Sequence, residues 1–394
     1  MERRDFLALA ALPLLPRRGL DGHVVTSVTG FRHVCERPKF VGKNAYKGDH
    51  GRQTVDDILR IKTDTGLEGI GVGAPTKQQA EALVGRSLGD LLTPEAIGKS
   101  PLGRHDHALY DLLGKATGVP AWTLLGGRGA EEVRVYDGSI YFVDLIPGYE
   151  NTYIKRILDE VDMGLAAGLR AFKVKVGRGF KWMPREAGDR RDIEVVRAIA
   201  MHVGPGVRVM VDGNNGFDLP GAIRWLDALD VDLYFVEEMF PETVEGDLRL
   251  KAHLASKGWK TKVADGESAG NVEHFDPYLK AGALDVLQGD IRAFGLSALR
   301  EQSRRALAAP GVTLAPHNWG SFLGVYMQAT LARGIPNFEM AEMDRAESDL
   351  FDVSAYALKD GLMSVPDVPG VGLVIREDVY AAKYRAKAWT VGKA

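Results

Sequence analysis

The chain has 394 residues, of which 45% are hydrophobic and 26% are charged, a balance typical of a globular protein. Its 50 Lys and Arg residues oppose 53 Asp and Glu residues, and the resulting net charge of -3 argues against a nucleic-acid partner. Cys35 is the only cysteine, which excludes internal disulfides and cysteine-rich zinc or iron–sulfur sites.

The amino-terminal segment, residues 1–20, carries an export-like pattern. Arg3-Arg4-Asp5-Phe6-Leu7 is followed by an Ala/Leu stretch and is similar to a twin-arginine signal, whose cargo crosses the membrane already folded. The apolar run 6–15 is far shorter than the roughly 20 residues of a membrane span. We therefore expect an exported, periplasmic protein, with a frayed end on a cytoplasmic protein as the alternative.

Residues 21–128 are predicted to form a small α+β domain. Apolar residues alternate with polar ones at 23–28, 55–63 and 67–72, around the turn Asp64-Thr65-Gly66, which predicts an antiparallel meander. From about residue 75 to the Gly126-Gly127 pair the pattern becomes helical.

Residues 129–360 alternate short β-rich runs with helical stretches, which predicts a parallel sheet with crossover helices. Eight strands in roughly 210 residues fit a (β/α)8 barrel, with a doubly wound sheet as the rival, although no Gly-x-Gly-x-x-Gly motif follows any strand. Residues 361–394 are expected to return to the first domain. The expected strands are 133–136, 171–176, 207–211, 233–236, 261–264, 286–288, 312–314 and 337–340.

Two lysines share one face of the second barrel strand. Lys173 and Lys175 are two residues apart, so both side chains point the same way, while Phe172, Val174 and Val176 take the other face. The apolar face indicates a strand inside the sheet, so we expect both lysines in the barrel mouth.

The next three strands each end in a carboxylate, namely Asp212, Glu237 and Glu267. In a barrel the carboxyl ends of the strands form the active-site face, so these three residues should converge there. Their charges would repel unless a cation neutralised them, and oxygen ligands without histidine favour Mg2+ over zinc.

The last three strands also end in groups that can exchange protons. Asp290 and His317 follow adjacent strands, and a carboxylate beside an imidazole fixes the tautomer of the ring. Glu339 is assigned to the end of the eighth strand, with Glu342 competing for the same role.

Taken together, the chain after residue 20 resembles the enolase superfamily, in particular its mandelate racemase subgroup (mandelate racemase/muconate lactonizing enzyme-like). The hairpin 61–71, the helix 107–115 and the corner 124–127 are similar to the family's capping domain. The barrel motifs occur in the family's order: Lys-x-Lys at 173 and 175, Asp-x-Asn at Asp212 and Asn214, the Glu-Glu and Gly-Glu pairs at 237 and 267, and Asp290 with His317.

The resemblance implies a modified barrel of (β/α)7β type, with an N-terminal α+β capping domain completed by the C-terminal segment. It also implies one Mg2+ ion on Asp212, Glu237 and Glu267, a small-molecule carboxylate substrate and a homo-oligomer. Lys175 would be the base on one face of the substrate, with its pKa lowered by the neighbouring Lys173. The remaining catalytic residues would be His317, oriented by Asp290, on the opposite face, and a protonated Glu339 beside the substrate carboxylate.

The expected first step is removal of the proton α to a carboxylate, which gives an enolate. Loss of a β-hydroxyl would then convert a sugar acid to a 2-keto-3-deoxy acid, the outcome that the resemblance favours. Reprotonation on the other face would make the protein a racemase or epimerase, and a non-catalytic metal-binding barrel is the third hypothesis. Substrate selection is expected to involve Asn214 and the basic capping-domain loop 31–51, including Lys39, Lys43 and Tyr46.

Overall fold

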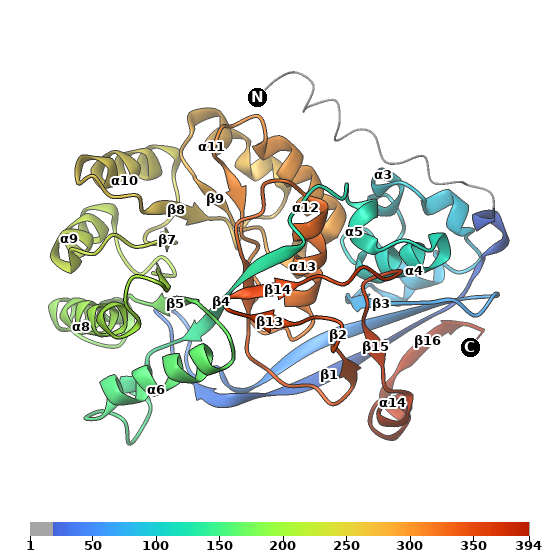
Figure 1. The fold of residues 1–394 in the computed structure, drawn as a ribbon, viewed down its shortest axis with the longest axis horizontal. Coiled ribbons are helices and arrows are strands. Elements are labelled where there is room, and N and C mark those ends of the chain that lie inside the picture. Colours follow the sequence, from blue (N-terminus) through green and yellow to red (C-terminus); the bar gives the residue numbers. More distant parts are fainter. Residues whose placement is uncertain (1–18, 394) are drawn as a thin grey trace.

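The computed structural model describes residues 19–393, which form a closed barrel joined to a smaller sheet-and-helix domain (Figure 1). The predicted export motif falls in residues 1–18 and so lies outside the described part. Within the described part, none of the helices combines the length and apolar character that crossing a bilayer would require.

Parallel strands form the barrel and close it into a ring. Strands β4 to β10 pair side by side in sequence order, β11 pairs with β4, and a bridge between Leu314 and Phe338 joins the last gap. This ring excludes the doubly wound alternative. The strands are β4 (Glu132–Ile140), β5 (Ala171–Lys175), β6 (Arg208–Asp212), β7 (Phe235–Glu237), β8 (Lys262–Asp265), β9 (Val286–Leu287), β10 (Thr313–Leu314) and β11 (Ala341–Met343).

Helices cover the outside of the ring between successive strands, and in the described chain β11 is followed by strands rather than by a further helix. The arrangement therefore matches the expected (β/α)7β pattern. The helices are α6 (Tyr153–Ala166), α7 (Arg178–Lys181), α8 (Arg185–Val203), α9 (Leu219–Leu229), α10 (Val244–Ser256), α11 (Asp276–Ala281), α12 (Ile291–Ala306) and α13 (Gly324–Gly334).

Apolar side chains fill the barrel interior below the mouth, so the barrel is a packed core and not a pore. Each of the eight barrel strands, or the residue next to it, contributes one buried side chain to this inner layer. Its members are Tyr136, Ala171, Met210, Phe235, Ala264, Val286, Ala315 and Met340.

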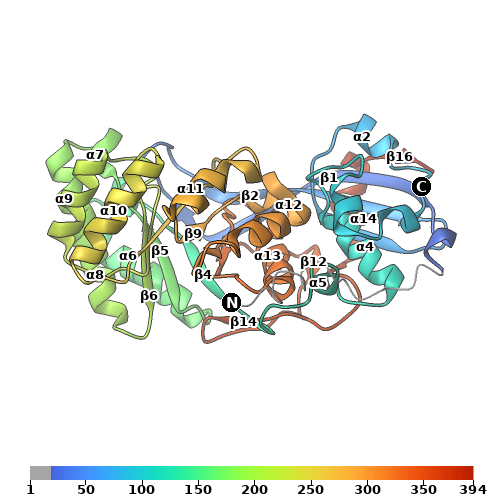
Figure 2. The same cartoon turned by 90° about the horizontal axis from the view of Figure 1, so that it is seen from above.

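The capping domain is built on an antiparallel sheet in the order β16-β1-β2-β3. The strands are β1 (Val25–Val41), β2 (Gly51–Thr63), β3 (Glu68–Val72) and β16 (Trp389–Gly392), so the C-terminal segment completes this sheet as expected. The first strand continues well past the predicted end at residue 28, and much of the predicted loop 31–51 is therefore strand. Figure 2 shows β1 and β2 reaching from the capping domain to the barrel.

The capping helices are α2 (Lys77–Glu81), α3 (Pro94–Gly98), α4 (His107–Thr117) and α5 (Ala121–Leu124). Helix α4 lies directly on β3 because Gly69 and Gly71 have no side chain: a Cβ at Gly69 would stand 2.2 Å from the Ala108 carbonyl oxygen. Asp111 then accepts backbone N–H groups from Ile70 and Val371, at 2.8 Å each, and so ties the helix to the sheet and to the returning chain.

The chain leaves the barrel through a hairpin. Strands β13 (Leu358–Lys359) and β14 (Leu362–Ser364) pair with each other, and β14 pairs with the first half of β4. The predicted domain boundary at residue 361 falls inside this hairpin. Strand β12 (Phe351–Asp352), before the hairpin, pairs with β15 (Val374–Ile375), after it, and α14 (Glu377–Lys383) then leads to β16.

We expect His33 to weaken the fold in acid. Its ring is buried between Ser348 Oγ, at 2.8 Å, and Tyr384 Oη, at 2.9 Å, and burial lowers its pKa from 6.5 to about 4. Because the folded-state pKa lies below the unfolded one, stability is complete above pH 6.5 and is lost as the pH falls toward 4. Between about pH 7 and pH 5 the loss should be about 2 kcal/mol in urea-unfolding free energy.

The control is His33→Gln, which cannot titrate. This variant should be less stable than the parent protein near neutral pH, yet its unfolding free energy should fall less on acidification. Parallel pH curves for the two proteins would show that His33 is not the titrating group.

Candidate active site

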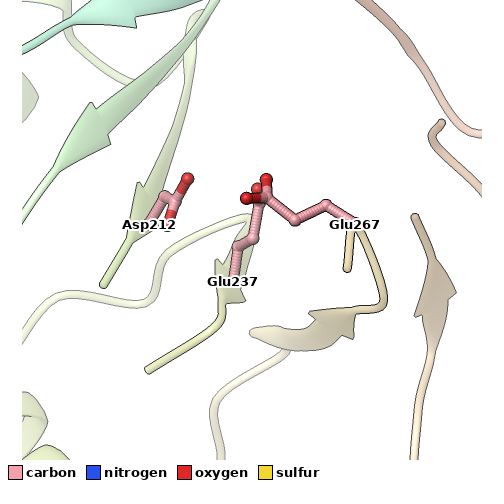
Figure 3. Close-up of side chains that lie close together, drawn as sticks. All are labelled: Asp212, Glu237 and Glu267. Carbon is pink, nitrogen blue, oxygen red and sulfur yellow. The ribbon is translucent and has the colours of Figure 1, made fainter. Parts of the chain in front are cut away.

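Three carboxylates meet at the carboxyl-terminal face of the barrel. Asp212 ends β6, Glu237 ends β7 and Glu267 follows β8, and one oxygen from each lies within 4.8 Å of the others. All three groups point into one space (Figure 3). Asp212 and Glu237 are fully buried, whereas the Glu267 side chain is 20% exposed. These are the three residues that the sequence pattern grouped as metal ligands.

The turn after β8 directs Glu267 toward this space. Gly266 has a φ of 115°, which side-chain-bearing residues rarely adopt, and a Cβ there would stand 2.3 Å from the Phe275 ring. Only glycine therefore fits between Asp265 and Glu267 without displacing the ring.

Two buried lysines from β5 neutralise part of the negative charge. Lys173 Nζ lies 2.7 Å from Glu237, 2.9 Å from Glu342 and 3.6 Å from Asp212. Lys175 forms an ion pair with Asp212. Burial alone would raise the pKa of Asp212, but Lys175 and Lys173 hold it down at about 2.

The residues fit a divalent cation with oxygen ligands. Burial raises the pKa of Glu237 well above its ordinary value, and the charges of Asp212, Glu342 and Glu267 add to this effect despite Lys173. The cluster thus carries more negative charge than its lysines compensate. A hard ion such as Mg2+ would supply the missing positive charge and accept these ligands. Gln288 Nε2 donates to Glu237 Oε2 at 2.6 Å and orients that carboxylate.

His317 and Asp290 form the expected dyad on the other side of the mouth. His317 Nδ1 lies 2.7 Å from Asp290 Oδ2, and Nε2 lies 3.2 Å from Glu267 Oε2. Burial opposes the charged imidazole, but Glu267 and Asp290 outweigh it and raise the pKa of His317 to about 10. Asp290 also caps α12 by accepting the N–H groups of Arg292 and Ala293.

The pKa of Lys175 differs from the expectation. Lys173 does lower it, as predicted, and burial acts in the same direction. The ion pair with Asp212 outweighs both effects, so the Lys175 pKa is raised in this structure. An ion that shared the charge of Asp212 would weaken this stabilisation of the ammonium.

Glu339 is not at the mouth, and its predicted position is wrong. Its carboxylate accepts from Lys262 Nζ at 2.7 Å and from Thr313 Oγ1 at 2.6 Å, and it also contacts Tyr234. Lys262 and Thr313 begin β8 and β10, so Glu339 lies at the amino-terminal end of the barrel.

The eighth strand lies further along the chain than the predicted range 337–340, which explains the misplacement. Glu339 N donates to the Leu314 carbonyl oxygen, while Ala341–Met343 continues upward beside β4. Glu342, the competing candidate, therefore reaches the mouth, where it contacts Lys173 and accepts the N–H of Asn318 at 2.7 Å. Burial alone would raise the pKa of Glu342, but the positive charges of Lys173 and His317 outweigh burial and lower it, so this carboxyl is ionised.

Of the four predicted substrate-binding residues, Asn214 contacts a metal-ligand candidate, whereas the surroundings of Lys39, Lys43 and Tyr46 differ from one another. Asn214 lies at the mouth, with its N–H on Asp212 Oδ1 at 2.8 Å. Lys39 is buried on Glu160 and the Ser139 carbonyl oxygen, at 2.6 and 2.7 Å, so its predicted substrate contact is wrong. Lys43 pairs with Asp49 at 2.6 Å, and Tyr46 is 48% exposed.

Sequence reasoning missed an aromatic wall beside Lys175. Tyr141 and Trp319 stack with ring centroids 4.7 Å apart, His50 contacts both rings, and Lys175 Nζ lies 5.2 Å from the centre of the Tyr141 ring. Trp319 stands two residues after His317, so its position was available as a signal. His50 arrives from the capping domain, in the loop 31–51 that was expected to select the substrate, but it was not among the residues named there.

Comparisons with known proteins agree with this geometry. A family model described as "Enolase C-terminal domain-like" matches residues 156–379. A galacturonate dehydratase from Geobacillus sp., solved with D-galacturonate and 5-keto-4-deoxy-D-galacturonate, is 33% identical, with a TM-score of 0.85 over 94% of this chain and 100% of that chain.

Two further relatives point to the same family. A mandelate racemase/muconate lactonizing protein from Geobacillus sp. Y412MC10, complexed with magnesium and tartrate, is 32% identical, with a TM-score of 0.87 over 96% of this chain and all of that one. The D-galactarolactone cycloisomerase of Agrobacterium fabrum is 29% identical over 293 residues, which is 69% of this chain and 71% of that protein.

Glu267→Gln should weaken Mg2+ binding at least about tenfold, because it removes one ligand charge while keeping the size of the side chain. Isothermal titration with MgCl2 measures the effect. The matched control is Glu339→Gln, which removes a carboxylate at the opposite end of the barrel and should leave the Mg2+ affinity unchanged. Equal affinities for the two variants would remove Glu267 from the ligand set.

Proposed function

The chain belongs to the enolase superfamily, in its mandelate racemase subgroup, and from that premise we propose that it is a Mg2+-dependent dehydratase of sugar acids. The observation that carries this proposal is the placement of proton-transferring groups on two sides of one acidic cluster. Lys175 contacts Asp212 on one side, and His317 lies 3.2 Å from Glu267 on the other. Dehydration needs both a base and an acid, and this mouth holds candidates for each.

Asp212, Glu237 and Glu267 would hold the Mg2+ ion. When bound, the ion supplies Lewis acidity, which stabilises the negative charge that develops on the substrate carboxylate. Lys173 lies among the same carboxylates and adds a fixed positive charge beside them. This charge needs no reorganisation during the reaction, because the Lys173 ammonium is already held by buried ion pairs.

Lys175 takes the proton from the carbon α to the carboxylate in the proposed reaction. Its amine must be neutral to do so, and the adjacent Lys173 lowers its pKa in that direction. Tyr141 covers one side of the Lys175 ammonium, with its ring centre 5.2 Å away, and limits the access of water to it.

His317 then donates the proton on Nε2 to the β-hydroxyl, so that the C–O bond breaks and water leaves. Asp290 holds Nδ1 and keeps Nε2 directed toward the mouth. The resulting enol becomes a ketone next to the carboxylate, which is a 2-keto-3-deoxy acid. The 5-keto-4-deoxy-D-galacturonate named for the Geobacillus dehydratase also has its keto group next to the carboxylate and its deoxy carbon one position further, because its carboxylate is carbon 6.

The quaternary structure and cellular location are further parts of the proposal. The resemblance to the family supports a homo-oligomer, and the Arg3-Arg4 motif supports export by the twin-arginine route. Light scattering of the purified protein tests the first. Cell fractionation with the Arg pair intact and replaced by Lys-Lys tests the second, because loss of the periplasmic fraction is expected only for the replaced pair.

Proton NMR in D2O tests the reaction. With Mg2+ and a panel of mono- and diacid sugars, including D-galacturonate and galactarate, we expect loss of the α-proton signal together with a keto-deoxy product. Addition of EDTA should abolish both. Exchange or inversion at the α-carbon without elimination would show that the protein is a racemase or epimerase and not a dehydratase. No exchange with any acid would refute the proposal.

His317→Asn should lower the rate of dehydration by several orders of magnitude, because no other group in the proposal protonates the leaving hydroxyl. Deuterium exchange at the α-carbon should persist, since Lys175 is unchanged. The same NMR assay measures both rates, and wild-type turnover by this variant would remove His317 from the mechanism. Lys175→Met is the complementary variant and should lose the exchange.

A further inference from the structure

His50 brings a capping-domain side chain to the barrel mouth. It lies in the segment between β1 and β2, and its ring contacts Tyr141 and Trp319 with centroid distances of 4.8 and 5.5 Å. Tyr141 follows β4 and Trp319 follows β10, so both belong to the catalytic end of the barrel. Lys175 packs on the same Tyr141 ring.

The contact with Trp319 defines which His50 nitrogen carries the proton. Trp319 Nε1 lies 2.9 Å from His50 Nδ1 and donates to it. An indole nitrogen only donates, so Nδ1 of His50 must be the acceptor. A neutral imidazole has one N–H group, which must therefore be on Nε2.

His50 stays neutral at physiological pH. Burial lowers its pKa to about 4, and the positive charges of Lys175, Arg37 and Lys47 act in the same direction. The Nε2–H group is thus a permanent hydrogen-bond donor and not an acid that releases its proton.

This donor has no partner among the residues that the structure describes, although Nε2 is shielded from solvent. Leaving a buried donor unpaired costs about 1–3 kcal/mol. Such a group is well suited to a partner that arrives with the substrate. A donor of this kind discriminates strongly, because a ligand without the matching oxygen leaves it unpaired.

We propose that His50 Nε2–H donates a hydrogen bond to a hydroxyl or carboxylate oxygen of the substrate, other than the carboxylate held at the Mg2+ ligands, and so selects which sugar acid reacts. Trp319 is the positioning residue that holds His50 in the donating tautomer. The inference rests on the proposed dehydratase function. It assigns a selecting role to one residue of the loop 31–51, in which the sequence had pointed to Lys39, Lys43 and Tyr46.

Kinetics with two His50 variants test the inference. His50→Phe keeps a ring against Tyr141 and Trp319 but has no donor, whereas His50→Gln retains an N–H near the Nε2 position. With the best acid of the panel, kcat/KM should fall about tenfold for His50→Phe and should be largely restored in His50→Gln.

Monodeoxy analogues of that acid make the test specific. For the wild type, one analogue should react about tenfold more slowly than the parent acid, and His50→Phe should treat the two equally. If His50→Phe keeps the wild-type preference, or slows all analogues and the parent acid by one common factor, the inference is wrong.

Ring-15N NMR of the full protein separates this inference from the reaction itself. We expect the Nε2–H tautomer for His50 from about pH 6 to pH 8, a mixture of tautomers in Trp319→Phe, and a shift of the Nε2 signal when Mg2+ and D-galacturonate or galactarate bind. An Nδ1–H tautomer, or an unchanged Nε2 signal at saturating acid, would overturn the role of His50. Absence of α-proton exchange would instead overturn the dehydratase.

Discussion

Excess negative charge at the barrel mouth is the constraint around which the site is arranged. Four carboxylates, Asp212, Glu237, Glu267 and Glu342, gather where water is largely excluded, and only Lys173, Lys175 and His317 oppose them in the contacts of the site. Each cationic group that could move a proton is thereby held in its charged form. A divalent cation held by Asp212, Glu237 and Glu267 would share the charge of Asp212 and so weaken its stabilisation of the Lys175 ammonium. Metal binding would thereby be coupled to the charge state of the proposed base.

Buried carboxylates also attach the capping domain to the barrel. Asp56 accepts the N–H groups of Phe322 and Leu323, at 2.9 and 3.0 Å, and Asp106 accepts those of Leu296 and Ser297. Each pair joins a capping-domain side chain to barrel backbone. The Asp56 contacts hold β2 against the barrel, and the Asp106 contacts hold the start of α4 there. Strand β2 follows directly on the segment that contains His50.

The barrel and its metal ligands could be predicted because strand ends in a parallel barrel share one face, so Asp212, Glu237 and Glu267 needed only correct strand ends. The prediction for Glu339 was wrong because the sequence does not distinguish an eighth strand that continues past Met340 from one that ends there. The prediction for Lys39 was wrong because its buried ion pair is made with Glu160, on a helix more than one hundred residues away in the sequence. His50 lies in the predicted loop 31–51 but was not singled out there, since its role follows from a contact between domains.

Asp290 serves both the imidazole of His317 and the start of a helix with a single side chain. One of its oxygens holds the imidazole of His317, and the other accepts two backbone N–H groups at the start of α12. The positive end of the helix dipole also favours the ionised carboxylate that the dyad needs. A change of residue type at this strand end would therefore release the His317 ring and loosen α12 together, which restricts the substitutions that this position can accept.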